Sequence, residues 1–411
     1  MNRFNYNLKL RWVYTTTKKW DTAMASTNEV KAVLNRLSIE TPSWAYGNSG
    51  TRFKVFSQPG VPRDPYEKVA DAAQVHKYTG SAPTVALHIP WDKVDDYKNF
   101  AAHAEGLGVK LGTINSNTFQ DDQYILGSVC APDPKIRAKA VAHLLDCIDI
   151  MDQVGVCDLK LWFADGTNYP GQDDIVDRQN RLAESLQQTY ARLGDNQRML
   201  LEYKFFEPAF YHTDVPDWGT SLLHCMALGP KAMVVVDTGH HAPGTNIEFI
   251  VASLLRAKRL GAFDFNSRFY ADDDLIVGAS DPFQLFRIMH EVNINGGFDF
   301  GTPVSYVLDQ CHNIEAKIPG QIRSIMNVQE AVAKAVLVDQ SALKASQGAG
   351  NVLEAHEVLM DAYNTDVRGL LREWRSDTGI DPEPMKAYAA GGYAQKIAAE
   401  RVGGNQAGWG A

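Results

Sequence analysis

Four carboxylate residues each follow an apolar run, at the position where a buried strand would end. They are Glu202 in LLEYK, Asp237 in VVVDTGHH, Asp264 in GAFDFNS and Asp309 in YVLDQCH. The intervals of 35, 27 and 45 residues each correspond to one strand plus one helix, which places the four acids on successive strands. Four acids brought together repel one another unless a cation neutralises them. A divalent metal is therefore the expected occupant.

A second polar group follows two of these strands. His240 lies three residues after Asp237, and Asp272 and Asp274 alternate in YADDDL. An extended backbone would point Asp272 and Asp274 to one side and Asp273 to the other. Asp237 could then bridge two metal sites. Ligands so rich in oxygen suit Mn²⁺, Mg²⁺ or Co²⁺.

Each position also has a simpler interpretation. An Asp that ends a strand is often a helix N-cap, and DDDL can be a solvated loop. The adjacent His241 could be the functional histidine in place of His240. The joint pattern favours metal sites, because independent helix caps have no reason to end four successive apolar runs.

Two basic side chains lie near the same strand ends. Lys204 is two residues past Glu202, so an extended segment places both on one face, where the ammonium could polarise a carbonyl or an oxyanion. His88 in ALHIPWD ends an earlier apolar run, and Asp92 could orient its imidazole. Lys204 could instead be a surface lysine, and His88 a structural histidine at a strand end.

Aromatic residues could form the walls of a substrate pocket beside these groups. They are Trp44, Trp91, Trp162 and Phe206. Their rings would supply flat apolar surfaces, although aromatic residues at strand ends are more often part of the core. The polar loop WFADGTNYPGQDD, residues 162–174, fits the rim of such a pocket.

The elements that must position these residues are short apolar runs separated by helical patterns. Eight candidate strands cover 44–47, 84–89, 109–114, 159–164, 199–203, 232–237, 261–265 and 303–309. Most are apolar on both faces, as in a parallel sheet covered by helices. The clearest helical patterns cover 133–155, 174–194, 246–261 and 281–292. This alternation predicts an α/β fold of the (β/α)8 barrel type rather than a doubly wound sheet.

Helical segments extend the barrel at both ends. An amphipathic pattern over 29–40 predicts an N-terminal helical extension, residues 1–40. The barrel core with its metal site is expected at 41–319. Residues 320–411 then hold the last barrel helix, an Ala-rich helical extension and a Gly-rich tail.

Composition excludes several classes of protein. Lys and Arg number 40 against 49 Asp and Glu, a formal charge of −9 that argues against a nucleic-acid-binding face. No apolar run approaches the roughly 18 residues that cross a bilayer, so we expect a cytoplasmic protein without a membrane partner. The five cysteines are widely spaced and lack a CxxC pair, which predicts neither a disulfide framework nor a zinc knuckle.

In combination, seven motifs resemble those of the L-rhamnose isomerase family, within the wider group of xylose-isomerase-like barrels. The motifs are TPSWAYGNSGTRF, ALHIPWD, LWFADGTNYPGQD, LLEYKFFEPAFYHTD, VVVDTGHHAPGTNIE, FNSRFYADDDLIVG and LDQCHN. The resemblance runs from about Thr41 to Gln310 and extends to the Gly-rich tail. It implies a two-metal aldose-ketose isomerase, usually a homotetramer and usually with manganese.

The resemblance also assigns ligands. By it, the structural metal is held by Glu202, Asp237 and Asp309, and the catalytic metal by His240, Asp272 and Asp274. One position departs, because rhamnose isomerases carry a histidine where this chain has Asp264, whereas xylose isomerases use an aspartate. The ligand set is therefore closer to all-carboxylate, which favours Mg²⁺ or Mn²⁺. Phe53 in TRF matches a loop aromatic that reaches a neighbouring subunit's pocket in the family.

The expected activity is conversion of L-rhamnose and related aldoses, such as L-lyxose, L-mannose and D-allose, by a metal-assisted hydride shift between C1 and C2. Two divalent ions, Mn²⁺ before Mg²⁺ or Co²⁺, would stabilise the developing alkoxide. Lys204 would add positive charge near the carbonyl, and Asp309 is counted with the catalytic residues. His88 would assist ring opening, with Asp92 setting its tautomer.

Two other activities remain open. A ketose 3-epimerase would use one metal and two acids to remove and return a proton, which would leave Asp272 and Asp274 without a function. A non-catalytic sugar-binding barrel would need neither these acids nor His240 and Lys204. No organic cofactor is expected, because the sequence has no GxGxxG fingerprint and no P-loop.

Overall fold

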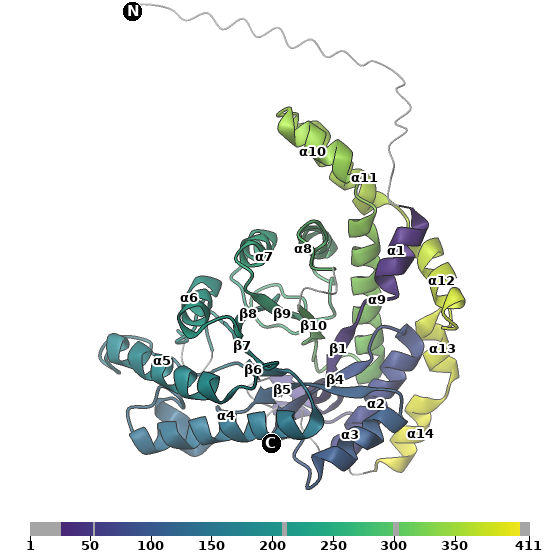
Figure 1. The fold of residues 1–411 in the computed structure, drawn as a ribbon. Helices are drawn as coiled ribbons and strands as arrows, with labels where there is room; N and C mark the ends of the chain where they lie inside the picture. The colour runs from purple at the N-terminus through teal and green to yellow at the C-terminus, as the bar shows by residue number, and fades with distance from the viewer. Residues whose placement is uncertain (1–25, 52–53, 208–211, 299–303, 403–411) are drawn as a thin grey trace, which may run out of the picture.

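Eight parallel strands form a closed barrel in the computed structural model, which describes residues 26–51, 54–207, 212–298 and 304–402 (Figure 1). In order around the barrel the strands are β1 (Ile39–Pro42), β4 (Thr84–Ile89), β5 (Lys110–Ser116), β6 (Asp158–Leu161), β7 (Arg198–Glu202), β8 (Ala232–Asp237), β9 (Leu260–Phe265) and β10 (Ser305–Leu308). All eight pairs of neighbours are parallel, and β10 closes the barrel against β1. The predicted (β/α)8 barrel is confirmed.

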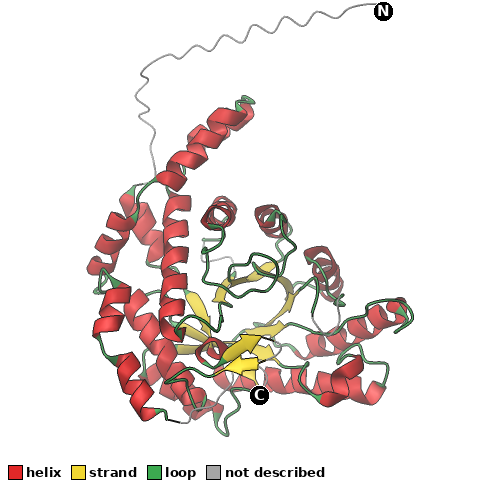
Figure 2. Cartoon of the chain, turned by 180° about the vertical axis from the view of Figure 1, so that it is seen from behind, coloured by secondary structure: helices red, strands yellow, loops and turns green. Residues whose placement is uncertain are grey.

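Helices surround the strands on the outside of the barrel, as Figure 2 shows in red around yellow. They are α2 (Pro65–Thr79), α3 (Tyr97–Gly106), α4 (Pro134–Val154), α5 (Ile175–Arg192), α6 (Trp218–Leu228), α7 (Ile247–Arg256), α8 (Pro282–Ile294) and α9 (Lys317–Val336). From α2 to α8 each begins after an Asp or Asn whose side chain accepts a hydrogen bond from a backbone N–H of the first turn. These caps satisfy donors that would otherwise lack partners, so they fix where each helix starts.

The start of the barrel differs from the sequence expectation. Residues 44–47 were expected to form the first strand, but Ser43–Tyr46 form a 3-10 helix and β1 lies just before it, at Ile39–Pro42. Trp44 and Tyr46 are buried, so an apolar run alone did not distinguish a strand from a buried turn. The predicted helix over 29–40 is also too long, because α1 covers Thr27–Leu34 and residues 39–40 belong to β1.

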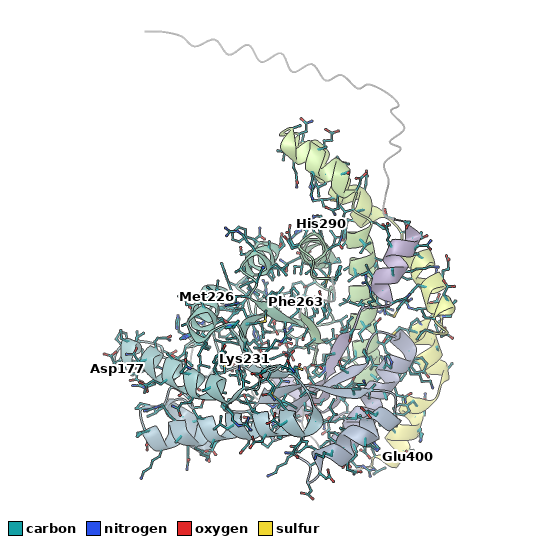
Figure 3. All side chains as sticks on the ribbon, viewed as in Figure 1. Asp177, Met226, Lys231, Phe263, His290 and Glu400 are labelled. Carbon is teal, nitrogen blue, oxygen red and sulfur yellow. The ribbon has the colours of Figure 1, made fainter. Side chains whose placement is uncertain are left out.

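The alternation of side chains in the strands separates the core from the polar centre. In β9, Phe263 and Phe265 point to one face and stack on each other, with ring centroids 4.8 Å apart (Phe263 is labelled in Figure 3). Asp264, between them, points to the opposite face. Burial of each large apolar side chain contributes about 1.5–3 kcal/mol, so this register is strongly favoured.

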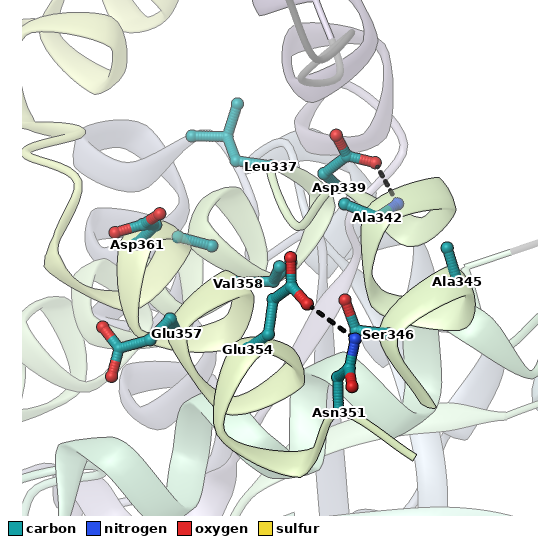
Figure 4. Close-up of a pocket in the computed structure, with 11 residues that line it drawn as sticks. Leu337, Asp339, Ala342, Ala345, Ser346, Asn351, Glu354, Glu357, Val358 and Asp361 are labelled. Carbon is teal, nitrogen blue, oxygen red and sulfur yellow. Dashed lines mark hydrogen bonds between the residues drawn. The ribbon is translucent and has the colours of Figure 1, made fainter. Parts of the chain in front are cut away.

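The C-terminal helices extend the barrel, as predicted. They are α10 (Gln340–Gly348), α11 (Val352–Asn364), α12 (Arg368–Asp377), α13 (Pro384–Ala390) and α14 (Tyr393–Glu400). The pair α10 and α11 projects away from the barrel in Figure 1. A groove along this pair is lined by apolar and acidic residues, among them Leu337, Val358, Ala362, Glu354, Glu357 and Asp361 (Figure 4). This groove is separate from the mouth of the barrel.

The helical extensions pack on the barrel's own helices. α1 and α12 contact α9, and α13 contacts both α2 and α9. Within the described residues, no helix combines the length and the apolar character that a membrane span requires. The division at residues 40 and 319 stays a prediction, although β1 begins at Ile39 and the last barrel helix at Lys317.

Candidate active site at the carboxyl ends of the strands

A cavity of about 400 Å³ opens at the carboxyl ends of the strands. Its lining includes the predicted residues Trp44, His88, Trp91, Trp162, Glu202, Lys204, His240, Asp264, Asp272 and Asp309. Glu202, Asp237 and Asp264 lie on β7, β8 and β9, and Asp309 directly follows β10, so the four predicted acids lie at the ends of the fifth to eighth strands of the barrel. In a (β/α)8 barrel this end is where active sites lie.

Glu202, Asp237 and His240 form a potential metal-binding group. One ligand atom of each lies within 4.8 Å of the others, and all three side chains are buried. His240 Nδ1 is 3.1 Å from Glu202 Oε1, and its Nε2 is 2.9 Å from Asp272 Oδ1 and 4.0 Å from Asp237 Oδ2. His240 therefore joins the two predicted groups of acids.

The local fold fixes the Asp237 carboxylate. Its Oδ1 accepts hydrogen bonds from the Gly239 backbone N–H at 2.6 Å and from Asn266 Nδ2 at 3.0 Å. Gly239 allows this close approach, because a Cβ there would lie 2.3 Å from Asn266 Oδ1. Asp237 pairs with Asp264 in the β8–β9 register, so the two acids stand side by side at the mouth of the barrel.

Asp272 and Asp274 lie at the centre, but the backbone differs from the prediction. They have φ angles of 50° and 49°, in the left-handed region, rather than the extended conformation. Residues other than glycine rarely adopt this backbone conformation, and such backbone strain concentrates at functional sites. Asp273 points away, and its carboxylate accepts a hydrogen bond from the Tyr270 backbone N–H at 3.1 Å.

The centre is electrostatically suited to cations. Burial, with Glu202 and Asp272 nearby, raises the pKa of Asp237 to about 6. Burial also raises the pKa of Asp274 and of Asp309 well above the ordinary range. Asp274 Oδ1 is buried and has no hydrogen-bond partner among the described residues. Without a cation, burial makes the ionised form of each of these carboxylates costly.

The raised pKa of Asp237 predicts that Mn²⁺ raises the Tm of the protein more at pH 7 than at pH 4.5. The pKa of Asp237 is about 6 in the folded chain against an ordinary value of 3.8, so between these values the native state holds a proton that the unfolded chain has lost. Stability of the metal-free protein therefore falls as pH rises through this window, whereas Mn²⁺ binding needs the ionised carboxylate. Thermal scans with and without Mn²⁺ measure the difference. An equal shift at both pH values would contradict this assignment.

Two lysines lie among the acids. Lys204 Nζ pairs with Asp272 and lies 2.8 Å from Glu207 Oε2 and 5.1 Å from the centre of the Trp162 ring. Lys160 of β6 pairs with Asp264, and both side chains are buried. Sequence reasoning found Lys204 but missed Lys160, because LKLWFA was interpreted only as an apolar strand. A lysine within a buried strand was the available signal.

Asp92 does not contact the ring of His88 as predicted. Its carboxylate accepts hydrogen bonds from the His88 backbone N–H at 2.7 Å and from Ser43 Oγ, and it pairs with Lys68 Nζ at 2.7 Å. His88 Nδ1 is buried without a hydrogen-bond partner among the described residues. The cause is Lys68, a buried lysine on α2 that sequence reasoning missed. Burial, with the positive charge of Lys68, lowers the pKa of His88 well below its ordinary value.

Aromatic rings form much of the cavity wall. Trp44 Nε1 donates a hydrogen bond to Asp309 Oδ1 at 2.8 Å, and His88 stacks on Trp91 with ring centroids 3.9 Å apart. Phe119, which sequence reasoning missed, packs against Trp162 with centroids 4.9 Å apart.

Two further aromatic predictions have different outcomes. Phe206 contacts Phe205 and is not among the described lining residues, because its neighbours Lys204 and Glu207 face the cavity instead. Phe53 lies outside the described residues, so its role and the homotetramer stay predictions.

A second acidic group near the cavity is an ion-paired network. Cys130, Asp165 and Asp214 lie close together and are buried. Asp165 accepts hydrogen bonds from the Ser128 backbone N–H and Oγ, both at 2.7 Å, and Asp214 pairs with Arg178 Nε at 2.8 Å. Burial raises the pKa of the Cys130 thiol, which keeps it protonated. This network joins the loops that follow β5, β6 and β7.

Comparison with known proteins gives close relatives. A probable sugar isomerase of Rhizobium meliloti is 41% identical over 382 residues, which cover 90% of this chain and 88% of that protein. The chain belongs to the sugar isomerase family. A probable sugar isomerase of Mesorhizobium japonicum shows the same identity and coverage. A xylose isomerase of Sinorhizobium fredii is 25% identical over 301 residues, 70% of this chain and 68% of that protein.

Solved structures extend the comparison to the fold. An L-ribulose 3-epimerase has a TM-score of 0.54 at 12% identity, covering 73% of this chain and 95% of its own. A D-psicose 3-epimerase from Clostridium cellulolyticum H10 has a TM-score of 0.50 at 14% identity, covering 73% and 99%. At these identities the likeness shows only the shared barrel. No protein-family model matches the chain.

The centre of this sugar isomerase family member fits a divalent metal. Its donors are carboxylate oxygens and one imidazole, which suit Mn²⁺, Mg²⁺ or Co²⁺. Asp274 Oδ1 has no hydrogen-bond partner among the described residues, and the pKa values of Asp237, Asp274 and Asp309 are raised. Both observations indicate that the positive charges of the protein do not fully neutralise these carboxylates.

Proposed function

We propose that this chain is a metal-dependent aldose-ketose isomerase that acts on L-rhamnose and related aldoses. The observation that carries the proposal is the joining of two acidic groups at one cavity through Asp237 and His240, with Lys204 in the cavity wall. Two groups of ligands suit two ions, which together can hold neighbouring oxygens of a sugar. The choice of L-rhamnose rests on the sequence motifs.

The ligands divide into two sets. Glu202, Asp237 and Asp309 would hold one divalent ion, and His240, Asp272 and Asp274 would hold the other, with Asp237 shared between the two sites. Bound ions would supply Lewis acidity toward the carbonyl and hydroxyl oxygens of the open-chain sugar, at which negative charge develops during a hydride shift from C2 to C1.

Lys204 supplies a fixed positive charge in this mechanism. Burial alone would lower the pKa of Lys204, but Asp272 and Glu207 raise it overall, so the ammonium stays protonated. It therefore donates hydrogen bonds and does not act as a base. An ammonium in a buried cavity stabilises an oxyanion far more than it does in water.

His88 is suited to ring opening. The lowered pKa keeps its imidazole neutral near pH 7, so one ring nitrogen can accept the proton of a sugar hydroxyl. Lys68 and Asp92 hold the backbone of His88 rather than its ring. Trp44, Trp91 and Phe119 exclude water from the apolar face of the sugar.

The test is an isomerisation assay on metal-stripped protein. The panel is L-rhamnose, L-lyxose, L-mannose, D-allose, D-ribose and L-ribose, each with Mn²⁺ and with EDTA. We expect Mn²⁺-dependent ketose formation with L-rhamnose turned over fastest. No ketose from any sugar, despite tight Mn²⁺ binding, would contradict the proposal and favour a sugar-binding protein.

Ketose 3-epimerisation is the second candidate. Two solved structures with a similar barrel are ketose 3-epimerases, and Glu202, Asp237 and His240 alone could hold one ion. That arrangement would leave Asp274 as a buried acid without a cation, which argues for isomerisation.

A further inference from the structure

Lys160 is a lysine inside the barrel, immediately below the candidate metal centre. Its side chain is 2% exposed. Lys160 is the register partner of Leu200 on β7, which precedes Glu202 by two residues, so its Cα lies deeper in the barrel than that of Glu202. Its side chain reaches upward, and its Nζ forms an ion pair with Asp264, which is also buried. Among the described residues, this is the one hydrogen bond that Lys160 Nζ makes to a side chain.

We propose that Lys160 is a built-in cation of the metal centre, and that Asp264 is its counter-ion rather than a metal ligand. The inference rests on the proposed metal-dependent function and deepens it. It assigns three carboxylates, those of Glu202, Asp237 and Asp309, to the first ion and makes Lys160 a positioning residue that sets the charge of the centre.

The placement of ligand atoms supports this division. Asp264 stands beside Asp237 in the register, but its Oδ1 faces Lys160. The ammonium therefore occupies the side of Asp264 that faces the barrel interior.

The cost of separating this pair also supports the proposal. A metal that took Asp264 as a ligand would have to share it with a buried ammonium or displace that ammonium. Displacement would leave Lys160 without its carboxylate partner at a position closed to water, and an unpaired buried charge is strongly unfavourable. A fixed pair avoids this cost. Lys204 differs, because Glu207 would remain its partner if Asp272 bound a metal.

The charge of the centre agrees with the proposal. The six carboxylates of Glu202, Asp237, Asp264, Asp272, Asp274 and Asp309 carry six negative charges when ionised. Lys160 and Lys204 offset two of them. Glu207, which also pairs with Lys204, adds a seventh negative charge. Two lysines and two divalent ions would together leave one negative charge, and without Lys160 two would remain in a buried site.

The test removes the pair as a unit. In the double variant Lys160→Met/Asp264→Asn the net charge of the centre is unchanged. We therefore expect two Mn²⁺ per chain, with dissociation constants raised by no more than about 100-fold, because only an indirect contact is lost. Mn²⁺ binding is followed by electron paramagnetic resonance. A larger loss, or one ion in place of two, would overturn the proposal.

A matched control is Arg198→Met/Asp158→Asn. This pair joins the amino ends of β6 and β7 and includes a 2.6 Å contact between Arg198 Nη2 and Asp158 Oδ2. The control separates the effect of a lost ion pair in these strands from an effect on the centre, and its Mn²⁺ binding should be unchanged.

A crystal structure of the unaltered protein with Mn²⁺ gives a second test that no folding defect can obscure. The proposal expects Asp264 bound to Lys160 and not to Mn²⁺, and a direct bond from Asp264 to Mn²⁺ would overturn it. If the unaltered protein bound no Mn²⁺, the proposed function would fail as well. If it bound two ions and only the double variant lost one, the inference about Asp264 alone would fail.

Discussion

Asp237→Asn is expected to remove both metal ions and to lower kcat/KM about a thousandfold or more. The reason is that metal ions supply several kcal/mol of transition-state stabilisation, and each 1.36 kcal/mol changes the rate tenfold. Asp237 lies beside His240 and is held by Gly239 and Asn266. An asparagine has the same shape but no charge, and its amide would face the N–H donors of Gly239 and Asn266. Metal analysis and steady-state kinetics measure the two effects.

Asp273→Asn is the matched control for this variant. Asp273 lies between two predicted ligands but is turned toward the Tyr270 backbone, so its loss should leave the Mn²⁺ content at two per chain. Retention of both ions and of full activity by Asp237→Asn would show that Asp237 is not shared between two sites.

Lys204→Met is expected to lower kcat about 100- to 1000-fold, the usual cost of removing one group that stabilises an oxyanion. The Mn²⁺ content should not fall, because the change removes a positive charge from beside Asp272. KM should change much less than kcat, since the ammonium acts on charge that develops during the reaction. Kinetics with saturating Mn²⁺ measure both constants.

Lys231→Met provides the comparison for Lys204. Lys231 Nζ lies 5.3 Å from the centre of the Tyr190 ring, much as Lys204 lies over Trp162, and donates to the Leu193 backbone C=O at 2.8 Å. It is remote from the cavity, so turnover should be retained. An equal loss in both variants would indicate that Lys204→Met acts through stability rather than through the reaction.

The barrel could be predicted because its strands are buried on both faces. The run AMVVVD over 232–237 became β8 without any change of bounds, and TVALHI over 84–89 became β4. The exception was WAYG, where buried Trp44 and Tyr46 belong to a 3-10 helix. The apolar residues of WAYG indicate that the segment is buried, but a run of four residues does not indicate whether its backbone is extended or helical.

The acids of the centre could be predicted from where each strand ends, but their partners could not. Lys68 lies 24 residues before Asp92 on a helix, and Lys160 lies 104 residues before Asp264. Such pairs depend on how strands and helices meet in space. The left-handed backbone of Asp272 and Asp274 was also not predicted. Asp adopts a positive φ more often than most residues, but this preference is too weak to show where one occurs.

The most direct test of the account is the fate of the C2 hydrogen during turnover. We would incubate the Mn²⁺-loaded protein with L-rhamnose in D2O and follow the sugar by NMR. A hydride shift predicts a ketose that carries the original C2 hydrogen at C1, with no deuterium from the solvent. Deuterium at C1 of the ketose would contradict the hydride shift. If L-rhamnose is not converted, a second incubation with the corresponding ketose decides the alternative, because deuterium at its C3 without aldose formation would establish an epimerase.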